Sequence, residues 1–231
     1  MNRKYLFLPG WAVHPDYYRR LNLADGVTPE VVDYGFFTPG LAFDPRAVAA
    51  MVTAVNTATV VLAHSLGTMF ALRAAARNRH LEALILFSPF PRFSEADDYP
   101  GRPLRDLRAM RMQLRRDPDG LLQNFYGAMS DPEVIGFKPG ATVNPVALDD
   151  GLVCLSEYDV RESLREVKCP VLMLQGGMDG ITGTGGVEYL AARLPNARLK
   201  FFPEAGHALP FTRTEECREA IRNFLNREAR S

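Results

Sequence analysis

The chain has 231 residues, of which 47% are hydrophobic, and this size and composition suit one α/β domain with an insertion. Its 27 basic and 27 acidic residues give a net charge of zero, which argues against a general attraction to nucleic acid or to an anionic membrane. No apolar run approaches the roughly 20 residues of a membrane span, and the first predicted strand begins so early that it leaves no room for a signal peptide.

That first strand, near residues 4–8, is followed at once by Pro9-Gly10-Trp11. We expect the backbone N–H of Trp11 to be one of two donors that bind the negatively charged oxygen of an acyl-transfer intermediate. Such a donor is worth on the order of 3 kcal/mol of activation free energy. Trp11 is the only tryptophan, and it could also serve in core packing.

A predicted strand near residues 59–63 breaks at Ser65, and a helix-forming stretch follows from Leu66. A sharp strand–turn–helix connection would raise the serine Oγ above the sheet edge as a nucleophile. It would also leave the first helical N–H groups unpaired, so the N–H of Leu66 is the second predicted oxyanion donor. Ala63 stands where the motif G-x-S-x-G has its first glycine. The alternative interpretation of Ser65 is a cap of the helix N-terminus.

Residues 89–169 contain no predicted core strand and follow a strand near residues 83–88. Helical patterns occur in this insertion near residues 103–116, 118–129 and 145–158. An insertion here would lie over the carboxyl ends of the strands, where α/β proteins bind their ligands. We therefore predict a helical cap over residues 89–169 and a core formed by residues 1–88 and 170–231.

The first predicted cap helix is rich in arginine and carries a single acid, Asp106. Its arginines are Arg102, Arg105, Arg108, Arg111, Arg115 and Arg116. At ~100° per residue the five from Arg105 to Arg116 fall within an arc of roughly 140°, beside an apolar face that we expect to pack downward. That apolar face is formed by Leu107, Met110 and Leu114. The charged face is either simply solvated or a docking site for an acidic macromolecule or a phosphate.

The next predicted cap helix carries apolar residues that could line a channel toward Ser65 or pack between cap and core. With one residue beyond the helix, these are Leu121, Leu122, Phe125, Tyr126, Met129 and Phe137. We expect Phe125, Tyr126 and Met129, together with Trp11, to contact the substrate.

Two later strands, near residues 170–175 and 197–202, are each followed by a glycine-containing loop with a titratable residue. Asp179 lies in the first loop and His207 follows Gly206 in the second. Alone, each has an ordinary alternative, an Asp-Gly turn and a surface histidine. In the order Ser65, Asp179, His207, each at a strand end, they predict a catalytic triad.

The remaining predicted elements continue the alternation of strand and helix. They are a strand near residues 30–34 and helices near residues 15–22, 44–56, 66–79, 185–194 and 212–228. Buried parallel strands with crossover helices predict an α/β fold with a mostly parallel central sheet flanked by helices.

Over nearly its whole length the chain resembles the α/β-hydrolase superfamily, and within it the pimeloyl-acyl-carrier-protein methyl ester esterases of biotin synthesis. The motifs that carry the resemblance are Pro9-Gly10-Trp11, His64-Ser65-Leu66-Gly67, Gly151-Leu152 with Asp159-Val160-Arg161, Gly177-Met178-Asp179-Gly180 and Ala205-Gly206-His207-Ala208. The resemblance implies an α/β-hydrolase fold and hydrolysis of the methyl ester of pimeloyl-acyl-carrier protein, with release of methanol. It also implies that cap arginines hold the acidic carrier protein, and the candidates are Arg105, Arg108, Arg111 and Arg115.

Two other functions stay open at this point. A general small-ester or carbon–carbon-bond hydrolase would use the same triad, and a non-catalytic binding protein would keep only the scaffold. We expect no metal and no cofactor, because no Cys/His cluster has the spacing of metal ligands. The three cysteines are odd in number and scattered, which favours a reducing cytoplasm.

Overall fold

A computed structural model describes residues 3–23 and 26–229 and contains one six-stranded sheet with the order β2-β1-β3-β4-β5-β6. The strands are β1 (Lys4–Leu8), β2 (Glu30–Val31), β3 (Thr59–His64), β4 (Leu81–Phe87), β5 (Val171–Gly176) and β6 (Ala197–Phe202). Every neighbouring pair is parallel, so the carboxyl ends of all six strands lie along one edge. The mostly parallel sheet predicted from the sequence is therefore confirmed.

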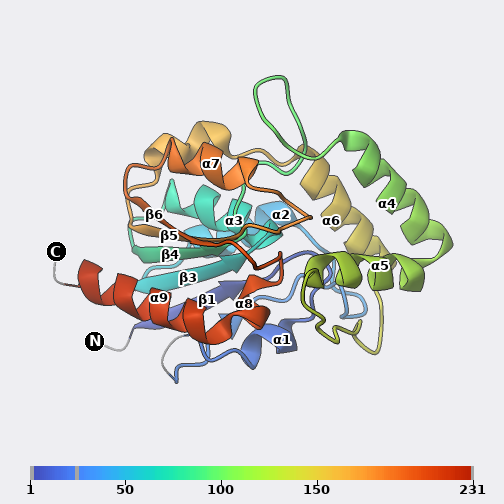
Figure 1. The fold of residues 1–231 in the computed structure, drawn as a ribbon, viewed down its shortest axis with the longest axis horizontal. Helices are drawn as coiled ribbons and strands as arrows, with labels where there is room; N and C mark the ends of the chain where they lie inside the picture. Colours follow the sequence, from blue (N-terminus) through green and yellow to red (C-terminus); the bar gives the residue numbers. More distant parts are fainter. Residues whose placement is uncertain (1–2, 24–25, 230–231) are drawn as a thin grey trace.

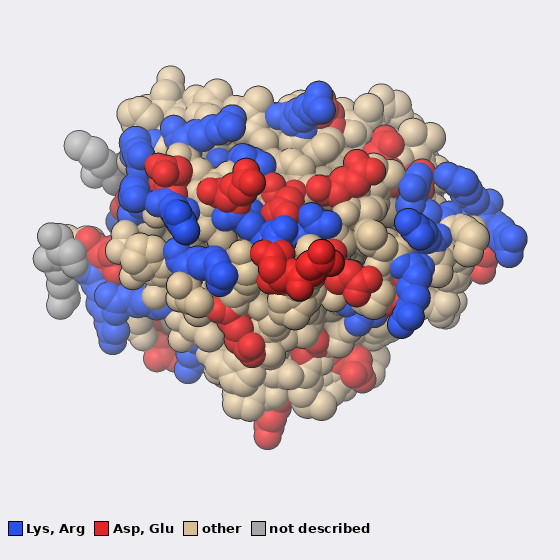
Figure 2. All heavy atoms as spheres, turned by 90° about the horizontal axis from the view of Figure 1, so that it is seen from above, with Lys and Arg blue, Asp and Glu red and all other residues tan. Residues whose placement is uncertain are grey.

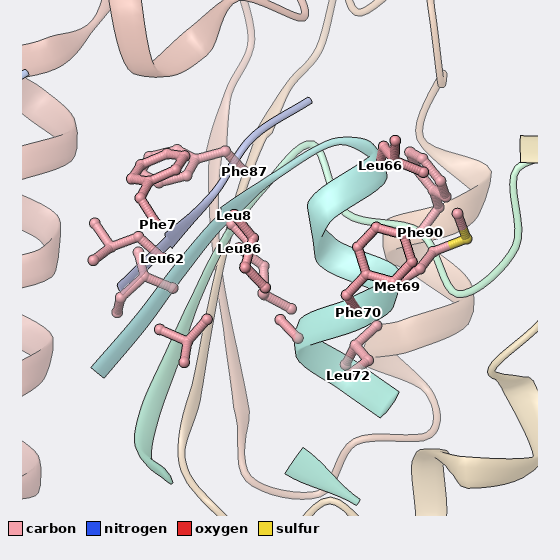
Figure 3. Packing of buried hydrophobic residues seen from close by; sticks show 14 of the residues in the cluster. Phe7, Leu8, Leu62, Leu66, Met69, Phe70, Leu72, Leu86, Phe87 and Phe90 are labelled. Carbon is pink, nitrogen blue, oxygen red and sulfur yellow. The ribbon is translucent and has the colours of Figure 1, made fainter. Parts of the chain in front are cut away.

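The centre of the sheet is apolar on both faces. All six residues of β3 are buried, as the continuous apolar run from Val60 predicts for a strand covered on two sides. Phe7 and Phe87 stack on one face with their ring centroids 6.2 Å apart, and Figure 3 shows Leu8 and Leu86 pointing to the opposite face. This two-sided core fixes the strand ends from which the candidate site is built.

Helices cover both faces of the sheet, with α2, α3 and α7 on one side and α1, α8 and α9 on the other (Figure 1). Their bounds are α1 (Pro15–Arg19), α2 (Pro45–Thr53), α3 (Leu66–Ala75), α7 (Gly185–Ala191), α8 (Leu209–Thr212) and α9 (Thr214–Glu228). Helix α3 is the most deeply placed, because nine of its ten residues are buried. Its first turn is thereby held against the ends of β1 and β3.

The 89–169 segment contains α4 (Leu104–Arg116), α5 (Pro118–Ser130), α6 (Pro145–Glu157) and the 3₁₀ helix η1 (Arg161–Glu166). Helices α4, α5 and α6 lie beyond the carboxyl ends of the strands (Figure 1). Asp117 caps α5 by accepting a hydrogen bond from the Gly120 N–H. Asn144 caps α6 and also donates from Nδ2 to the carbonyl of Gly35, which ties this helix to the loop after β2.

The predicted elements are all present, and the differences lie at their ends. The strand predicted near residues 30–34 is only two residues long. After it, the amide of Val32 makes one further hydrogen bond to the carbonyl of Phe7, and the chain then turns away at Gly35, whose φ is 79°. The helix predicted near residues 66–79 ends at Ala75. No helix in residues 3–23 and 26–229 is both long and apolar enough to cross a membrane.

Candidate active site

Ser65 lies on a strained turn between β3 and α3, with φ 52° and ψ −119°. Its amide donates to the carbonyl of Phe87 on the next strand, at 3.0 Å, which fixes the turn against β4. Gly67 makes the turn possible, because a Cβ there would lie 2.3 Å from the carbonyl oxygen of Leu8. A positive φ costs a serine roughly 1–3 kcal/mol, so the surrounding structure must hold it in place.

Asp179 and His207 form a buried pair after the ends of β5 and β6. The Nδ1 of His207 lies 2.8 Å from Oδ2 of Asp179, and the two residues are 1% and 5% exposed. The carboxylate also accepts bonds from the amides of Ile181 and Thr182 and from the Thr182 hydroxyl. Burial alone would raise the pKa of Asp179, but the interactions with His207 and Thr182 outweigh it and hold the pKa well below its usual value.

The other nitrogen of the His207 ring, Nε2, is buried and has no hydrogen-bond partner among the residues that the structure describes. The loop that carries the ring is held tightly: Gly206 packs so closely that a Cβ would lie 1.9 Å from the carbonyl oxygen of Asp131. The amide of Ala208 donates to the carbonyl of Met129 at 3.0 Å. The ring is therefore oriented by Asp179 on one side, while its second nitrogen is free to exchange a proton.

The two predicted oxyanion donors, the amides of Trp11 and Leu66, have no carbonyl partner within residues 3–23 and 26–229. Leu66 is the first residue of α3, so its N–H belongs to the positive end of the helix dipole. The loop of Trp11 is anchored by residues of the 89–169 segment. The Trp11 Nε1 donates to the carbonyl of Leu148 at 3.0 Å, and the Tyr126 hydroxyl donates to the carbonyl of Ala12 at 2.7 Å.

Ser65 is 6% exposed and lines a small cavity of about 70 Å³ between the core and α4–α6. The cavity is lined by Trp11, Ser65, Phe93, Arg102, Asp106, Leu107, Met110, Phe125, Leu155 and Ile181. Of the predicted substrate contacts, Trp11 and Phe125 line it and meet edge to face, with ring centroids 4.8 Å apart. Tyr126 and Met129 do not line it: Tyr126 holds the Trp11 loop, and Met129 is fully buried.

Sequence reasoning did not assign most of the cavity lining. Leu107 and Met110 were predicted only to pack downward, and the structure shows that this face of α4 covers Ser65. Phe93, Leu155 and Ile181 come from loops and helices whose partners no local pattern identifies. Arg102 and Asp106, an ion pair at 3.2 Å, also line the cavity and are the only charged residues in the part of its lining that the structure describes.

The four predicted docking arginines divide into two pairs. Arg111 is tied to Asp149 of α6 by two hydrogen bonds of 2.7 and 2.8 Å, and Arg115 approaches the same carboxylate at 3.7 Å. Arg105 is 86% exposed, and Arg108 is exposed with no ion-pair partner among the residues that the structure describes. Figure 2 shows Lys and Arg side chains gathered at the end of the molecule where Figure 1 places α4.

Comparisons with known proteins establish the family of the chain. Residues 5–220 match the alpha/beta hydrolase family model. The chain is 31% identical, over 239 residues, to a pimeloyl-[acyl-carrier protein] methyl ester esterase from Xanthomonas campestris pv. campestris (strain B100), with 95% of this chain and 94% of the relative covered. It is 30% identical, over 249 residues, to the protein of the same name from Aromatoleum aromaticum, with 97% and 99% covered.

Solved structures show the same fold at lower identity. An esterase from Exiguobacterium antarcticum superimposes with a TM-score of 0.84 at 19% identity, covering 97% of this chain and 92% of the other. At such identity the likeness establishes the fold alone. Fold, strand order and the family match over nearly the whole chain lead to one conclusion: the chain belongs to the alpha/beta hydrolase family.

Proposed function

We propose that the protein is a serine esterase that hydrolyses the methyl ester of an acyl chain carried on an acyl-carrier protein, the reaction named for its relatives. The observation that supports ester hydrolysis is the buried Asp179–His207 pair. Among the described residues, Nε2 of His207 has no hydrogen-bond partner, and His207 lies at the same edge of the sheet as the strained Ser65. The carrier part is supported by the similarity to the esterases of Xanthomonas and Aromatoleum and by the exposed arginines of α4.

The reaction would proceed in two steps of acyl transfer. Ser65 Oγ attacks the ester carbonyl while His207 Nε2 accepts its proton, and Asp179 stabilises the resulting imidazolium. The amides of Trp11 and Leu66 bind the oxyanion, each contributing on the order of 3 kcal/mol. The carbon–oxygen bond to methoxide then breaks, and His207 returns the proton so that methanol leaves.

The second step regenerates the enzyme. Water loses a proton to His207 Nε2 and attacks the acyl-serine carbonyl. As the intermediate collapses to a carboxylic acid, the bond from the acyl carbon to Ser65 Oγ breaks and His207 returns the proton to Oγ. The low pKa of Asp179 keeps this carboxylate ionised, so that it can hold the Nδ1–H of His207 throughout. The cavity beside Ser65 has a mostly apolar lining, which would keep competing water away from the acyl chain.

The test compares two substrates and one variant. Wild-type protein should hydrolyse the methyl ester of pimeloyl-acyl-carrier protein with a kcat/KM at least about tenfold above that for free dimethyl pimelate. Ser65→Ala should lose both activities by a factor on the order of 10³ or more, because no other group supplies the nucleophile. A fluorophosphonate probe should label wild-type protein but not the variant.

Each other outcome has a definite meaning. Equal kcat/KM for both esters would make the protein a general small-ester hydrolase. Ser65→Ala protein that keeps more than a few per cent of the activity would remove Ser65 from the mechanism. A wild-type protein that neither turns over nor reacts with the probe would be a binding protein on this scaffold.

A further inference from the structure

A chain of hydrogen bonds passes directly beneath the candidate active site. The amide of Gly10 donates to the hydroxyl oxygen of Tyr18 at 3.0 Å. That oxygen lies 2.8 Å from Nδ1 of His64, and His64 Nε2 lies 3.0 Å from the carbonyl oxygen of His207. The chain thus begins at the residue before Trp11, passes through the residue before Ser65, and ends on the backbone of His207.

The direction of every bond in this chain is fixed by chemistry. A carbonyl oxygen can only accept, so His64 Nε2 carries the proton and donates to His207. His64 Nδ1 is then a lone pair, and the Tyr18 hydroxyl must donate to it. The hydroxyl oxygen in turn accepts the N–H of Gly10. One tautomer of a neutral His64 satisfies all three bonds.

Burial enforces this state. Tyr18 and His64 are both fully buried, so no water competes for their polar atoms. Burial and the nearby His207 ring lower the pKa of His64 to about 3, which keeps the ring neutral in ordinary buffers. A buried polar network that is fully satisfied is rigid, because each lost bond leaves an unpaired group in a dry environment.

Gly10 shows how closely the parts fit. A Cβ at this position would lie 3.1 Å from His64 Nδ1, 3.3 Å from the Tyr18 hydroxyl and 3.4 Å from the Ser65 Cβ. The oxyanion loop, the nucleophile turn and the network are therefore in contact. The position of one is set by the others.

We propose that His64 and Tyr18 are positioning residues, which hold the oxyanion loop and the His207 loop in register with Ser65 through one directed hydrogen-bond chain. The inference rests on the proposed ester hydrolysis at Ser65. Among the described residues, neither side chain makes a hydrogen bond to Ser65 Oγ or to Nε2 of His207. Displacements of the order of 1 Å in such loops can lower turnover by up to about 10²-fold, so their effect is expected in kcat.

Two substitutions of His64 separate the two halves of the chain. The amide nitrogen of Gln in His64→Gln reaches the position of Nε2 and can still donate to His207, but it offers Tyr18 no acceptor at Nδ1. The shorter Asn in His64→Asn presents its oxygen near Nδ1 and cannot reach His207. We expect His64→Gln to keep at least about tenfold more kcat than His64→Asn, with KM for p-nitrophenyl butyrate within about twofold of wild type for both.

Tyr18→Phe completes a double-mutant cycle. It should lower kcat more in the wild-type and His64→Asn backgrounds, where it removes the bonds to Gly10 and to the Nδ1-side acceptor, than in His64→Gln, where it removes only the bond from the Gly10 amide. All rates are taken per active site titrated with a fluorophosphonate, and thermal midpoints are recorded, so that loss of folded protein is not counted as loss of turnover.

The outcomes are distinguishable from those of the proposed function, because wild-type hydrolysis and probe labelling are measured in the same assay. If wild type is active and all variants keep its kcat within about twofold per titrated site, the inference is overturned while the proposed function stands. Equal kcat losses in His64→Gln and His64→Asn, or losses of Tyr18→Phe that are the same in all backgrounds, would also overturn it.

Discussion

Among the described residues other than glycine, only Ala12, Ser65 and Ser88 have a positive φ, at 55°, 52° and 47°. All three follow strand ends on the same edge of the sheet, after β1, β3 and β4. Left-handed backbone in such residues is unfavourable and persists only where packing and hydrogen bonds hold it. The strain of this protein is thus concentrated where the proposed chemistry takes place.

His64 should make the free energy of unfolding depend on pH. The unfolded chain protonates this ring near pH 6.5, whereas the folded protein does so only near pH 3. Stability contributed by the neutral ring is therefore complete above pH 6.5 and is lost as the pH falls, by up to about 1.4 kcal/mol per pH unit. In urea titrations, the difference in the free energy of unfolding between wild type and His64→Gln should decrease by up to about 2 kcal/mol when the pH is lowered from 7 to 5.

The control for this experiment is His80→Gln, since His80 is exposed. This variant should follow the pH dependence of wild type. Parallel pH profiles for wild type and His64→Gln would show that the ring titrates in the folded protein as it does in the unfolded chain.

At the scale of elements, the ion pair between Arg111 and Asp149 joins α4 to α6. The two hydrogen bonds between Arg111 and Asp149 match the planar guanidinium to the carboxylate, and they lower the pKa of Asp149. The side chains are 32% and 24% exposed, so solvent screens part of the interaction. The first role of Arg111 is therefore to stabilise the 89–169 segment, and binding of a partner is secondary.

Arg111→Gln should lower the free energy of unfolding by about 1 kcal/mol, because Asp149 loses its closest partner. Arg108→Gln, on the same helix and without an ion-pair partner among the described residues, should change it by less than about 0.5 kcal/mol. Urea unfolding at low ionic strength provides the comparison. Equal effects of the two substitutions would contradict the assignment.

The elements show which features sequence could predict. Strand and helix periods are local, so β3, α3 and the helices α4, α5 and α6 were located to within a few residues. The side chains that contact one another are not local: the partner of Arg111 lies 38 residues later, and the partner of His64 lies 46 residues earlier. A histidine inside an apolar strand was a usable signal, because a buried imidazole needs partners, but the sequence does not name them.

At the scale of the whole molecule, a neutral chain carries a local excess of positive charge. The total of 27 basic and 27 acidic residues conceals the arginine-rich face of α4. Figure 2 shows mixed charge over the middle of the visible face, Lys and Arg gathered at the end where Figure 1 places α4, and further Lys and Arg beside acidic residues toward the opposite end. Such separation steers an acidic partner to one side of a protein without attracting polyanions in general.

The double substitution Arg105→Glu with Arg108→Glu should lower kcat/KM for the carrier-bound methyl ester by at least about tenfold and leave that for dimethyl pimelate within about twofold. The matched control is Arg198→Glu with Lys200→Glu on β6, which changes the net charge equally at the other end of the molecule (Figure 1). The measurement is steady-state kinetics at low and high salt. If both double variants impair the carrier substrate equally, α4 is not the docking surface.

The placement of Ser65, Asp179 and His207 along one edge of the sheet was predictable, because the carboxyl ends of parallel strands share that edge and each candidate follows a strand. The lining of the cavity was not, because it joins residues from both the core and the 89–169 segment. Tyr126 and Met129 illustrate this: both lie on the expected helix, yet one fixes a loop and the other packs in the core.

The 89–169 segment is joined to the loops of the site by bonds from Trp11 to Leu148, from Tyr126 to Ala12, and from Ala208 to Met129. In chimeras that exchange this segment between related hydrolases, the donor and the acceptor of each of these bonds would therefore come from different parent proteins, even if each half folded correctly. A transplant that preserves activity should carry residues 11–12 and 206–208 along with the helices. Exchange of the segment would then change substrate preference and catalytic rate together, and neither property could be transferred alone.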